Sequence, residues 1–227
     1  MVEINNQEAH PEGLTEAQER LALQLFDVGA IKFGDFKLKL HEKNPEAPLS
    51  PVYIDLRVLR RFPEAKAATV DVYEELIRPL QFDLLADVPT AATPLVSSLS
   101  DRLGVGMVTP RTDAKTHGSG ASIDGLLNSD QGKRAVLIDD LVTRADSKLE
   151  AAAILVEKGI KVQDIVVLVD REQGGEKQLA EAGYKLHAAL KMSQMLPFYD
   201  RVGRISQEVY QDSVQRLNAL NKFIGVA

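Results

Sequence analysis

The first regular block of hydrophobic residues along the chain has helical spacing. Its apolar side chains recur every three or four residues between Thr15 and Gly29. Thr15 and Gln18 form a capping-box pattern, so the helix is predicted to begin there. Gly29 is a suitable residue to end it. The polar residues 1–14 that come before are expected to form a flexible N-terminus.

The remaining blocks alternate between strand-like and helix-like patterns. Strands are expected over residues 31–40, 52–54, 82–88, 106–109, 135–138, 165–169 and 184–190. Helices are expected over residues 63–78, 91–103, 146–158, 176–182 and 204–221. Residues 41–49 and 111–130 are polar, contain turn formers and lack periodicity, which predicts loops.

The alternation of strands and helices determines the expected fold class. Two strands, 135–138 and 165–169, are continuous apolar runs, which are typical of strands buried on both faces. The pattern predicts an α/β fold with a mostly parallel sheet that helices cover on both sides. In such sheets ligands bind beyond the carboxyl ends of the strands, so a site is expected among the polar residues there.

Composition narrows the class of protein further. The chain has 227 residues, a formal net charge of −6 and no cysteine. The length fits one domain, here residues 15–227. The lack of cysteine excludes disulfide scaffolds and thiolate zinc sites, and the acidic charge argues against a nucleic acid partner. The apolar stretches are too short for a membrane span and the start shows no signal sequence, so we expect a cytoplasmic protein without a membrane partner.

The sharpest local feature is a pair of adjacent acids, Asp139 and Asp140, at the end of a buried strand. A short turn follows and opens a helix near Asp146. Such carboxylates can hold ribose hydroxyls or a hydrated Mg²⁺, and the amides at the helix start can hold a phosphate. The alternative is that Asp146 caps its helix and the acid pair is a solvated turn. The spacing alone leaves both interpretations open.

The segment from Val136 to Ser147 resembles the phosphoribosyl pyrophosphate (PRPP) motif of type I phosphoribosyltransferases. Segments 29–36, 50–57 and 168–175 resemble orotate phosphoribosyltransferases, most closely the form found as the first half of eukaryotic UMP synthases. The resemblance implies the type I phosphoribosyltransferase fold, a mostly parallel central sheet flanked by helices with a small hood. Residues from about 15–60 and C-terminal segments would form the hood.

The resemblance also implies an activity. Orotate phosphoribosyltransferases make orotidine 5′-monophosphate and pyrophosphate from orotate and PRPP, with Mg²⁺, in de novo pyrimidine biosynthesis. The implied partners are these small-molecule substrates and a second copy of the chain in a homodimer. No orotidylate decarboxylase domain is expected to follow, since the chain ends too soon for one.

By the same resemblance, Asp139 and Asp140 would hold ribose hydroxyls and Mg²⁺-bound waters. Lys115 and His117 would supply catalytic cations from a mobile loop, residues 111–125, that closes over the neighbouring subunit's site. Arg171 would pair with the orotate carboxylate through its planar fork. The full set of implied substrate contacts is Lys39, Tyr53, Ile54, Thr90, Ala91, Arg111, Thr143, Arg144, Ala145, Asp146, Ser147 and Arg171.

The chain departs from the family pattern at its phosphate-handling loops. Ala145 and Asp87 stand where the family carries glycine, and Thr112 stands where it carries lysine. Asp146 places a carboxylate where the 5′-phosphate is expected. Two like charges about 4 Å apart repel by roughly 4 kcal/mol at an effective dielectric constant near 20. Arg144 could offset this repulsion by reaching the phosphate or Asp146.

Two functions therefore remain open on the sequence. The first is an active orotate phosphoribosyltransferase, which the acid pair, Lys115, His117 and Arg171 favour. The second is a catalytically silent paralogue, a pseudoenzyme that binds a pyrimidine or a protein partner, which Asp87, Asp146 and Thr112 favour. A nucleic-acid-binding regulator is the weakest alternative, because no basic stripe is present. His41, in the predicted loop, is expected to be solvated.

Overall fold

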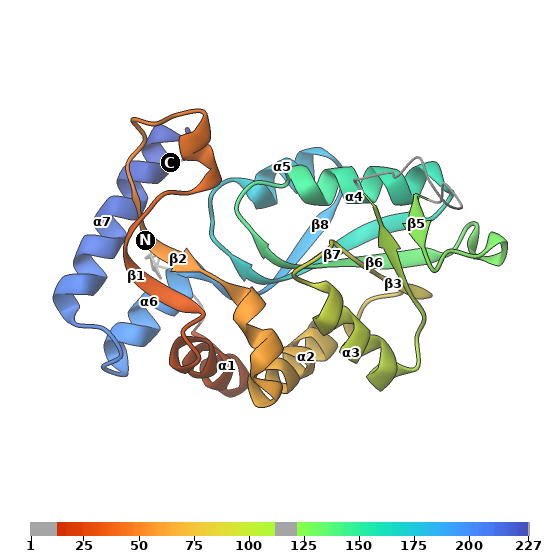
Figure 1. Ribbon diagram of the computed structural model, residues 1–227, viewed down its shortest axis with the longest axis horizontal. Coiled ribbons are helices and arrows are strands. Elements are labelled where there is room, and N and C mark those ends of the chain that lie inside the picture. Colours follow the sequence, from red (N-terminus) through yellow and green to blue (C-terminus); the bar gives the residue numbers. More distant parts are fainter. Residues whose placement is uncertain (1–12, 112–121, 227) are drawn as a thin grey trace, which may run out of the picture.

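The computed structural model describes residues 13–111 and 122–226. Its centre is a six-stranded sheet in the order β5-β4-β3-β6-β7-β8 (Figure 1). The strands pair in parallel except β5, which runs antiparallel to β4 at one edge. The strands of this sheet are β3 (Leu84–Asp87), β4 (Met107–Pro110), β5 (Ile123–Asp124), β6 (Arg134–Val142), β7 (Lys161–Asp170) and β8 (Lys185–Lys191). The predicted mostly parallel α/β sheet is confirmed.

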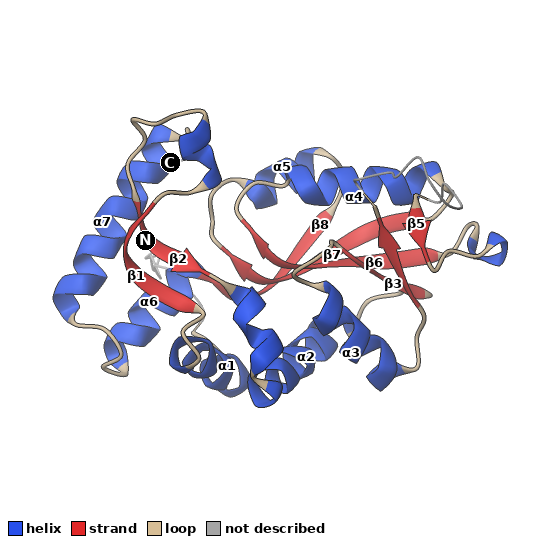
Figure 2. Cartoon of the chain, viewed as in Figure 1, coloured by secondary structure: helices blue, strands red, loops and turns tan. Residues whose placement is uncertain are grey.

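Helices cover both faces of this sheet (Figure 2). One face carries α4 (Asp146–Glu157) and α5 (Gly175–Glu181), and the other carries α2 (Pro63–Ile77) and α3 (Thr93–Leu103), with α1 (Glu16–Asp27) beside α2 (Figure 1). Side chains along β6 alternate between two separate hydrophobic clusters. Val136 and Ile138 belong to the cluster under α2 and α3, whereas Leu137 belongs to the cluster under α4.

A second, two-stranded antiparallel sheet lies beside the large one. It pairs β1 (Ile31–Phe36) with β2 (Ser50–Ile54). The helix α7 (Gln207–Phe223) lies along the same side of the molecule as this pair, and α6 (Met192–Arg201) precedes it (Figure 1). The short helices η1 (Lys39–Glu42) and η2 (Leu56–Arg61) flank β2 in the sequence.

Several predicted elements have the expected local cause. Thr15 caps α1 with a full capping box, and Gly29 follows the helix with φ of 73°. Pro63 stands in the first turn of α2, as predicted. Among the described residues, no helix is long and apolar enough to cross a bilayer.

Other elements differ from the predictions. The strand expected over 135–138 extends to Val142, so Asp139 and Asp140 are strand residues rather than a turn. The predicted loop 111–130 contains β5 and a short helix, η3 (Asn128–Asp130). The helix α6 is not among the predicted elements, and it contains Pro197. Its buried Met192, Met195, Leu196 and Tyr199 nevertheless have helical spacing.

Candidate active site

The carboxyl ends of β3, β6 and β7 bring acidic residues to one edge of the large sheet. Asp87 lies opposite Ile138, Asp139 lies opposite Val167, and Asp170 lies opposite Val142 in the strand register. Parallel strands place their carboxyl ends on the same side, which is where ligands bind in such sheets. The sequence prediction of polar groups gathered at this edge is confirmed.

Asp139 is buried and its charge is paired inside the fold. The ammonium group of Lys148, from the first turn of α4, forms an ion pair with Asp139 Oδ2. Both residues are buried, and the Tyr73 hydroxyl donates to the Asp139 carbonyl oxygen at 2.8 Å. Burial raises the pKa of Tyr73 well above its usual value, with further increases from Asp140 and Asp139. Lys148 is not among the residues that the sequence predicted for the site.

Asp140 is only half-buried, unlike its neighbour. Its Oδ1 accepts a hydrogen bond from the Leu141 amide at 2.8 Å. Burial, followed by the nearby charge of Asp139, raises the pKa of Asp140 to about 7, while Lys148 acts in the opposite direction. The two adjacent acids therefore differ in exposure and in the groups that bond to them.

The turn after β6 packs tightly against the start of α5. A Cβ on Gly175 would collide with the Val142 side chain and lie 3.2 Å from the Thr143 carbonyl oxygen, so only glycine fits there. Thr143 is half-buried and Arg144 is exposed. The Ala145 amide donates to Gln178 Oε1 at 2.9 Å. Gln178 of α5 thus fixes this turn, a contact that the sequence did not suggest.

Arg171, directly after β7, is a buried cation. Its Nη2 donates to Ser50 Oγ at 3.0 Å and to the Val52 carbonyl at 3.2 Å, and its Nε donates to Gln173 Oε1 at 3.2 Å. Burial lowers the pKa of Arg171 to about 10, so the guanidinium keeps its charge at neutral pH. Within residues 13–111 and 122–226, no carboxylate forms an ion pair with it.

The loop that carries Arg171 is anchored to the end of α7. Gln173 is fully buried and its Nε2 donates to Asn221 Oδ1 at 3.2 Å. Gly174 lies so close to Val226 that a Cβ there would clash with it, and its φ of 92° also favours glycine. The chain end beyond α7 therefore holds the segment that positions Arg171.

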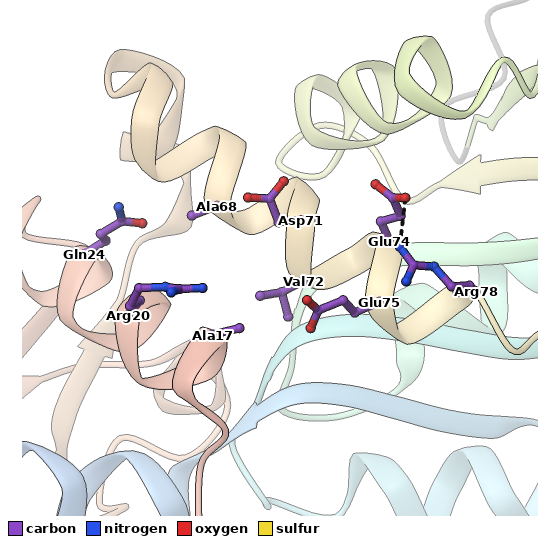
Figure 3. Close-up of a pocket in the computed structure, with 9 residues that line it drawn as sticks. All are labelled: Ala17, Arg20, Gln24, Ala68, Asp71, Val72, Glu74, Glu75 and Arg78. Carbon is purple, nitrogen blue, oxygen red and sulfur yellow. Dashed lines mark hydrogen bonds and ion pairs between the residues drawn. The ribbon is translucent and has the colours of Figure 1, made fainter.

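A surface cavity of about 290 Å³ lies between α1 and α2, apart from these strand ends (Figure 3). Its lining combines small apolar residues with charged ones, and Glu74 and Arg78 form an ion pair there at 3.2 Å. None of the residues after β3, β6 or β7 lines it. The candidate site is therefore the strand edge and not this cavity.

Comparison with known proteins decides the family. The chain is 38% identical over 173 residues to the orotate phosphoribosyltransferase of Methanopyrus kandleri, which covers 76% of this chain and 88% of that protein. The chain belongs to the orotate phosphoribosyltransferase family. No family model matches it.

Some relatives of this chain are longer and carry additional sequence. It is 35% identical to the bifunctional enzyme PyrF/PyrE of Nostoc over 84% of its own length, and 34% identical to the uridine 5′-monophosphate synthase of Bos taurus over 90%. It spans only 38% and 41% of those two proteins.

Solved structures agree with the family assignment. UMP synthase of Leishmania donovani is 33% identical with a TM-score of 0.75, over 92% of this chain and 42% of that one. Orotate phosphoribosyltransferase of Aeropyrum pernix is 27% identical with a TM-score of 0.69, over 82% of this chain and 99% of that one. The phosphoribosyltransferase fold predicted from the motifs is confirmed.

Two departures of this chain from the family pattern have a structural explanation. Asp87 is fully buried, and its carboxylate accepts hydrogen bonds from the Thr93 and Thr109 hydroxyls. The Asp87 carboxylate is therefore held inside the fold by two hydroxyl groups. Ala145 has φ of −89° and its methyl group belongs to the cluster under α4. Its Cβ thus packs into the core.

The third departure, Asp146, still places a carboxylate at the start of α4. Asp146 is the first residue of α4 and is exposed, while Ala145 is the N-cap and makes no side-chain capping bond. The alternative that Asp146 caps its helix is wrong. Its carboxylate interacts favourably with the positive end of the helix dipole, at the place where a phosphate would also bind. Ser147, the next residue, is exposed as well.

The residues expected to contact pyrophosphate lie in the turn after β3. Thr90 is exposed and Ala91 is half-buried, and the peptide bond between Pro89 and Thr90 is cis. The Arg60 guanidinium donates to the Thr90 carbonyl oxygen. Arg60 thus holds the backbone of this turn.

The small sheet carries the remaining expected contacts. Tyr53 is half-buried and stacks on Phe36 with ring centroids 5.4 Å apart, and Ile54 is buried. Lys39 is exposed in η1. His41 is buried instead of solvated, because its Nδ1 accepts from the Leu38 amide at 2.9 Å within that short helix.

Only the two ends of the expected mobile loop, Arg111 and residues 122–125, are described. Arg111 is exposed and its Nε pairs with Asp124 Oδ2 at 2.7 Å. Thr112, Lys115 and His117 lie outside the described residues. Their assigned roles rest on the family resemblance.

Proposed function

We propose that this chain transfers the phosphoribosyl group of PRPP to orotate, forming orotidine 5′-monophosphate and pyrophosphate in pyrimidine biosynthesis. The observation that carries the proposal is the buried guanidinium of Arg171, beside β2, with no anionic partner among the residues described. A buried cation is stabilised when an anion pairs with it, and a planar carboxylate suits the arginine fork. Orotate carries such a carboxylate.

The guanidinium of Arg171 donates hydrogen bonds from only some of its nitrogens, which supports a ligand at the remaining one. Nε and Nη2 donate to Gln173, Ser50 and Val52, whereas Nη1 has no acceptor in the described part of the chain. The Nη1 side is then the one that reaches orotate. The backbone of Tyr53 and Ile54, in the same strand as Val52, would read the pyrimidine edge.

The ribose and phosphates of PRPP would lie along the neighbouring strand ends. Thr143, Arg144, Ser147 and the first amides of α4 would bind the 5′-phosphate, since helix N-termini favour anions. Thr90 and Ala91 would contact the pyrophosphate. In the proposed role of the loop, Lys115 and His117 stabilise the charge that leaves on pyrophosphate, with Lys39 and Arg111 as further cations.

The acidic residues at this edge fit Mg²⁺ of the kind bound with a phosphate substrate. Such ions use one or two carboxylates together with phosphate oxygens and water, and Asp140 offers one half-buried carboxylate. Among the described residues, no group of three acidic, histidine or cysteine side chains could hold a metal ion. A bound Mg²⁺ would take its other ligands from phosphate oxygens and water. When bound, Mg²⁺ offsets negative charge on pyrophosphate.

The assembly and location belong to the same proposal. We propose a cytoplasmic homodimer, on the strength of the family resemblance, with the loop of one subunit acting at the site of the other. Sedimentation of the purified chain tests the dimer. A mixture of two inactive variants, one altered at Lys115 and one at Arg171, should regain part of the activity if the loop acts across subunits.

A silent paralogue that binds only the pyrimidine is the second candidate function. The exposed Asp146 at the start of α4 and the Ala145 amide already bonded to Gln178 favour it, because both reduce the room for a phosphate. Titration with orotate and with PRPP plus Mg²⁺, followed by an orotidylate-formation assay, separates the two. Turnover supports the enzyme, whereas orotate binding without PRPP binding supports the paralogue.

A further inference from the structure

We propose that Lys148 gives the two acids different roles. Its ion pair keeps the Asp139 carboxylate inside the fold, where it stabilises the structure. Asp140 alone then offers its carboxylate to the ribose hydroxyls. The inference deepens the proposed function and rests on it. The inference differs from what the family resemblance implies, namely that both Asp139 and Asp140 contact the substrate.

The geometry of β6 separates the two acids. Consecutive strand residues point to opposite faces. Leu137 packs under α4, so Asp139, two residues later, shares the α4 face, and Ile138 and Asp140 share the other. Lys148 comes from α4, the helix that covers the Asp139 face. The ion pair therefore joins groups that the strand and the helix both direct toward each other.

The ion pair between Lys148 and Asp139 is almost completely buried. The Lys148 side chain is 4% exposed and the Asp139 side chain 7% exposed, which leaves no open carboxylate edge for a ligand. A buried charge that loses its partner strongly destabilises a fold, whereas removing both charges together is often tolerated. Asp140 is half-buried, and its Oδ1 accepts a hydrogen bond from the Leu141 amide at 2.8 Å.

Lys148 also moderates the charge that Asp140 experiences. Without the ammonium group, two carboxylates would adjoin at a partly buried strand end. This lysine thus acts on the substrate-facing acid through Asp139, as a positioning residue.

The test compares single and paired substitutions in the full chain. The variants are Asp140→Asn, Asp139→Asn, Lys148→Met and the double Asp139→Asn with Lys148→Met. Lys158→Met is a matched control, since Lys158 lies at the exposed end of the same helix. Thermal unfolding, PRPP affinity by calorimetry and kcat/KM for orotidylate formation are measured for each.

The proposal predicts a distinct pattern. Asp140→Asn reduces kcat/KM by roughly 10- to 100-fold, the loss of charged hydrogen bonds to hydroxyls, without lowering the unfolding temperature. Each single change at Asp139 or Lys148 lowers the unfolding temperature. The double variant recovers it and keeps kcat/KM within about fivefold of the wild type. Lys158→Met changes neither.

Two results would overturn the proposal. One is a double variant that regains stability but loses activity as Asp140→Asn does, which would give Asp139 a substrate contact. The other is a double variant less stable than both singles, which would deny the pairing; if it does not fold, Asp139→Asn assayed below its unfolding temperature decides the first point. A wild-type chain that neither binds PRPP nor forms orotidylate contradicts the proposed function, while the unfolding temperatures still report on the pair.

Discussion

At the scale of single residues, the account depends most on Arg171. Arg171→Ala should weaken orotate binding by roughly 10- to 100-fold, since a hydrogen bond between charged groups contributes about 1.5–3 kcal/mol. Arg171→Lys should recover little of this loss, because a lysine lacks the planar fork. PRPP affinity should be nearly unchanged in both. Calorimetry with each ligand measures this.

The control for Arg171 is Arg201→Ala. Arg201 is an exposed arginine that pairs with Glu19 far from the strand ends. Its removal should leave orotate affinity intact. An Arg171→Ala variant that is folded and binds orotate as tightly as the wild type would remove the pyrimidine site from this position.

Substitution of Asp146 should strengthen ligand binding, whereas substitution of Arg171 should weaken it. Asp146→Asn should tighten PRPP binding about fivefold, because two unit charges about 4 Å apart repel by about 1 kcal/mol in a water-like dielectric. The exposed position of Asp146 makes this value more suitable than the larger one for a partly buried site. Glu150→Gln, an exposed acid on the same helix, is the control. Equal PRPP affinity in the Asp146 variant and the wild type would show that this carboxylate does not face the phosphate.

Asp140 makes stability depend on pH. Its pKa is about 7 in the folded chain, above the usual 3.8, through burial first and Asp139 next, with Lys148 opposing and Tyr73 nearby. Between these two values the unfolded chain loses its proton earlier, so this group makes folding less favourable as the pH rises from about 4 to 7. Asp140→Asn should flatten that part of the stability profile. Denaturant unfolding at a series of pH values tests it, and an unchanged profile would contradict the assignment.

At the scale of elements, α7 supports the proposed orotate site through the loop that carries Arg171. Asn221 bonds to Gln173, which in turn accepts from Arg171 Nε, so the helix end fixes the orientation of the guanidinium. Asn221→Ala should weaken orotate binding several-fold while leaving PRPP binding unchanged. Asn218→Ala, an exposed asparagine of the same helix, is the matched control. Equal losses for both ligands would indicate general unfolding of the helix end instead.

The periodicity of the chain predicted most elements but not how the acid pair is used. Capping at Thr15 and the apolar runs of β6 and β7 are local signals, and the structure confirms them. Lys148 was overlooked, although it stands at helical spacing from buried Ala151, Ala152 and Leu155. A lysine on a buried helix face indicates a paired charge, and this signal could have found it. The contacts of Gln173, Gln178 and Asn221 join distant segments, and no local pattern encodes them.

At the scale of the whole molecule, the parallel sheet explains why the site lies where it does. Its strands bring Asp140, the turn before α4 and Arg171 to one edge, and the small sheet meets that edge at Ser50 and Val52. In the proposed function, the groups that bind the base come from both sheets. Most of those that bind ribose and phosphate follow strands of the large sheet, with Lys39 of η1 as a further phosphate contact. Binding of the two substrates should therefore be separable by mutation.

The most direct test of the account is titration of the wild-type chain with PRPP and Mg²⁺, then with orotate, followed by an assay for orotidylate on the same sample. The account predicts that both ligands bind and that orotidine 5′-monophosphate forms. Orotate binding with no PRPP binding and no product would contradict it and leave a silent pyrimidine-binding scaffold.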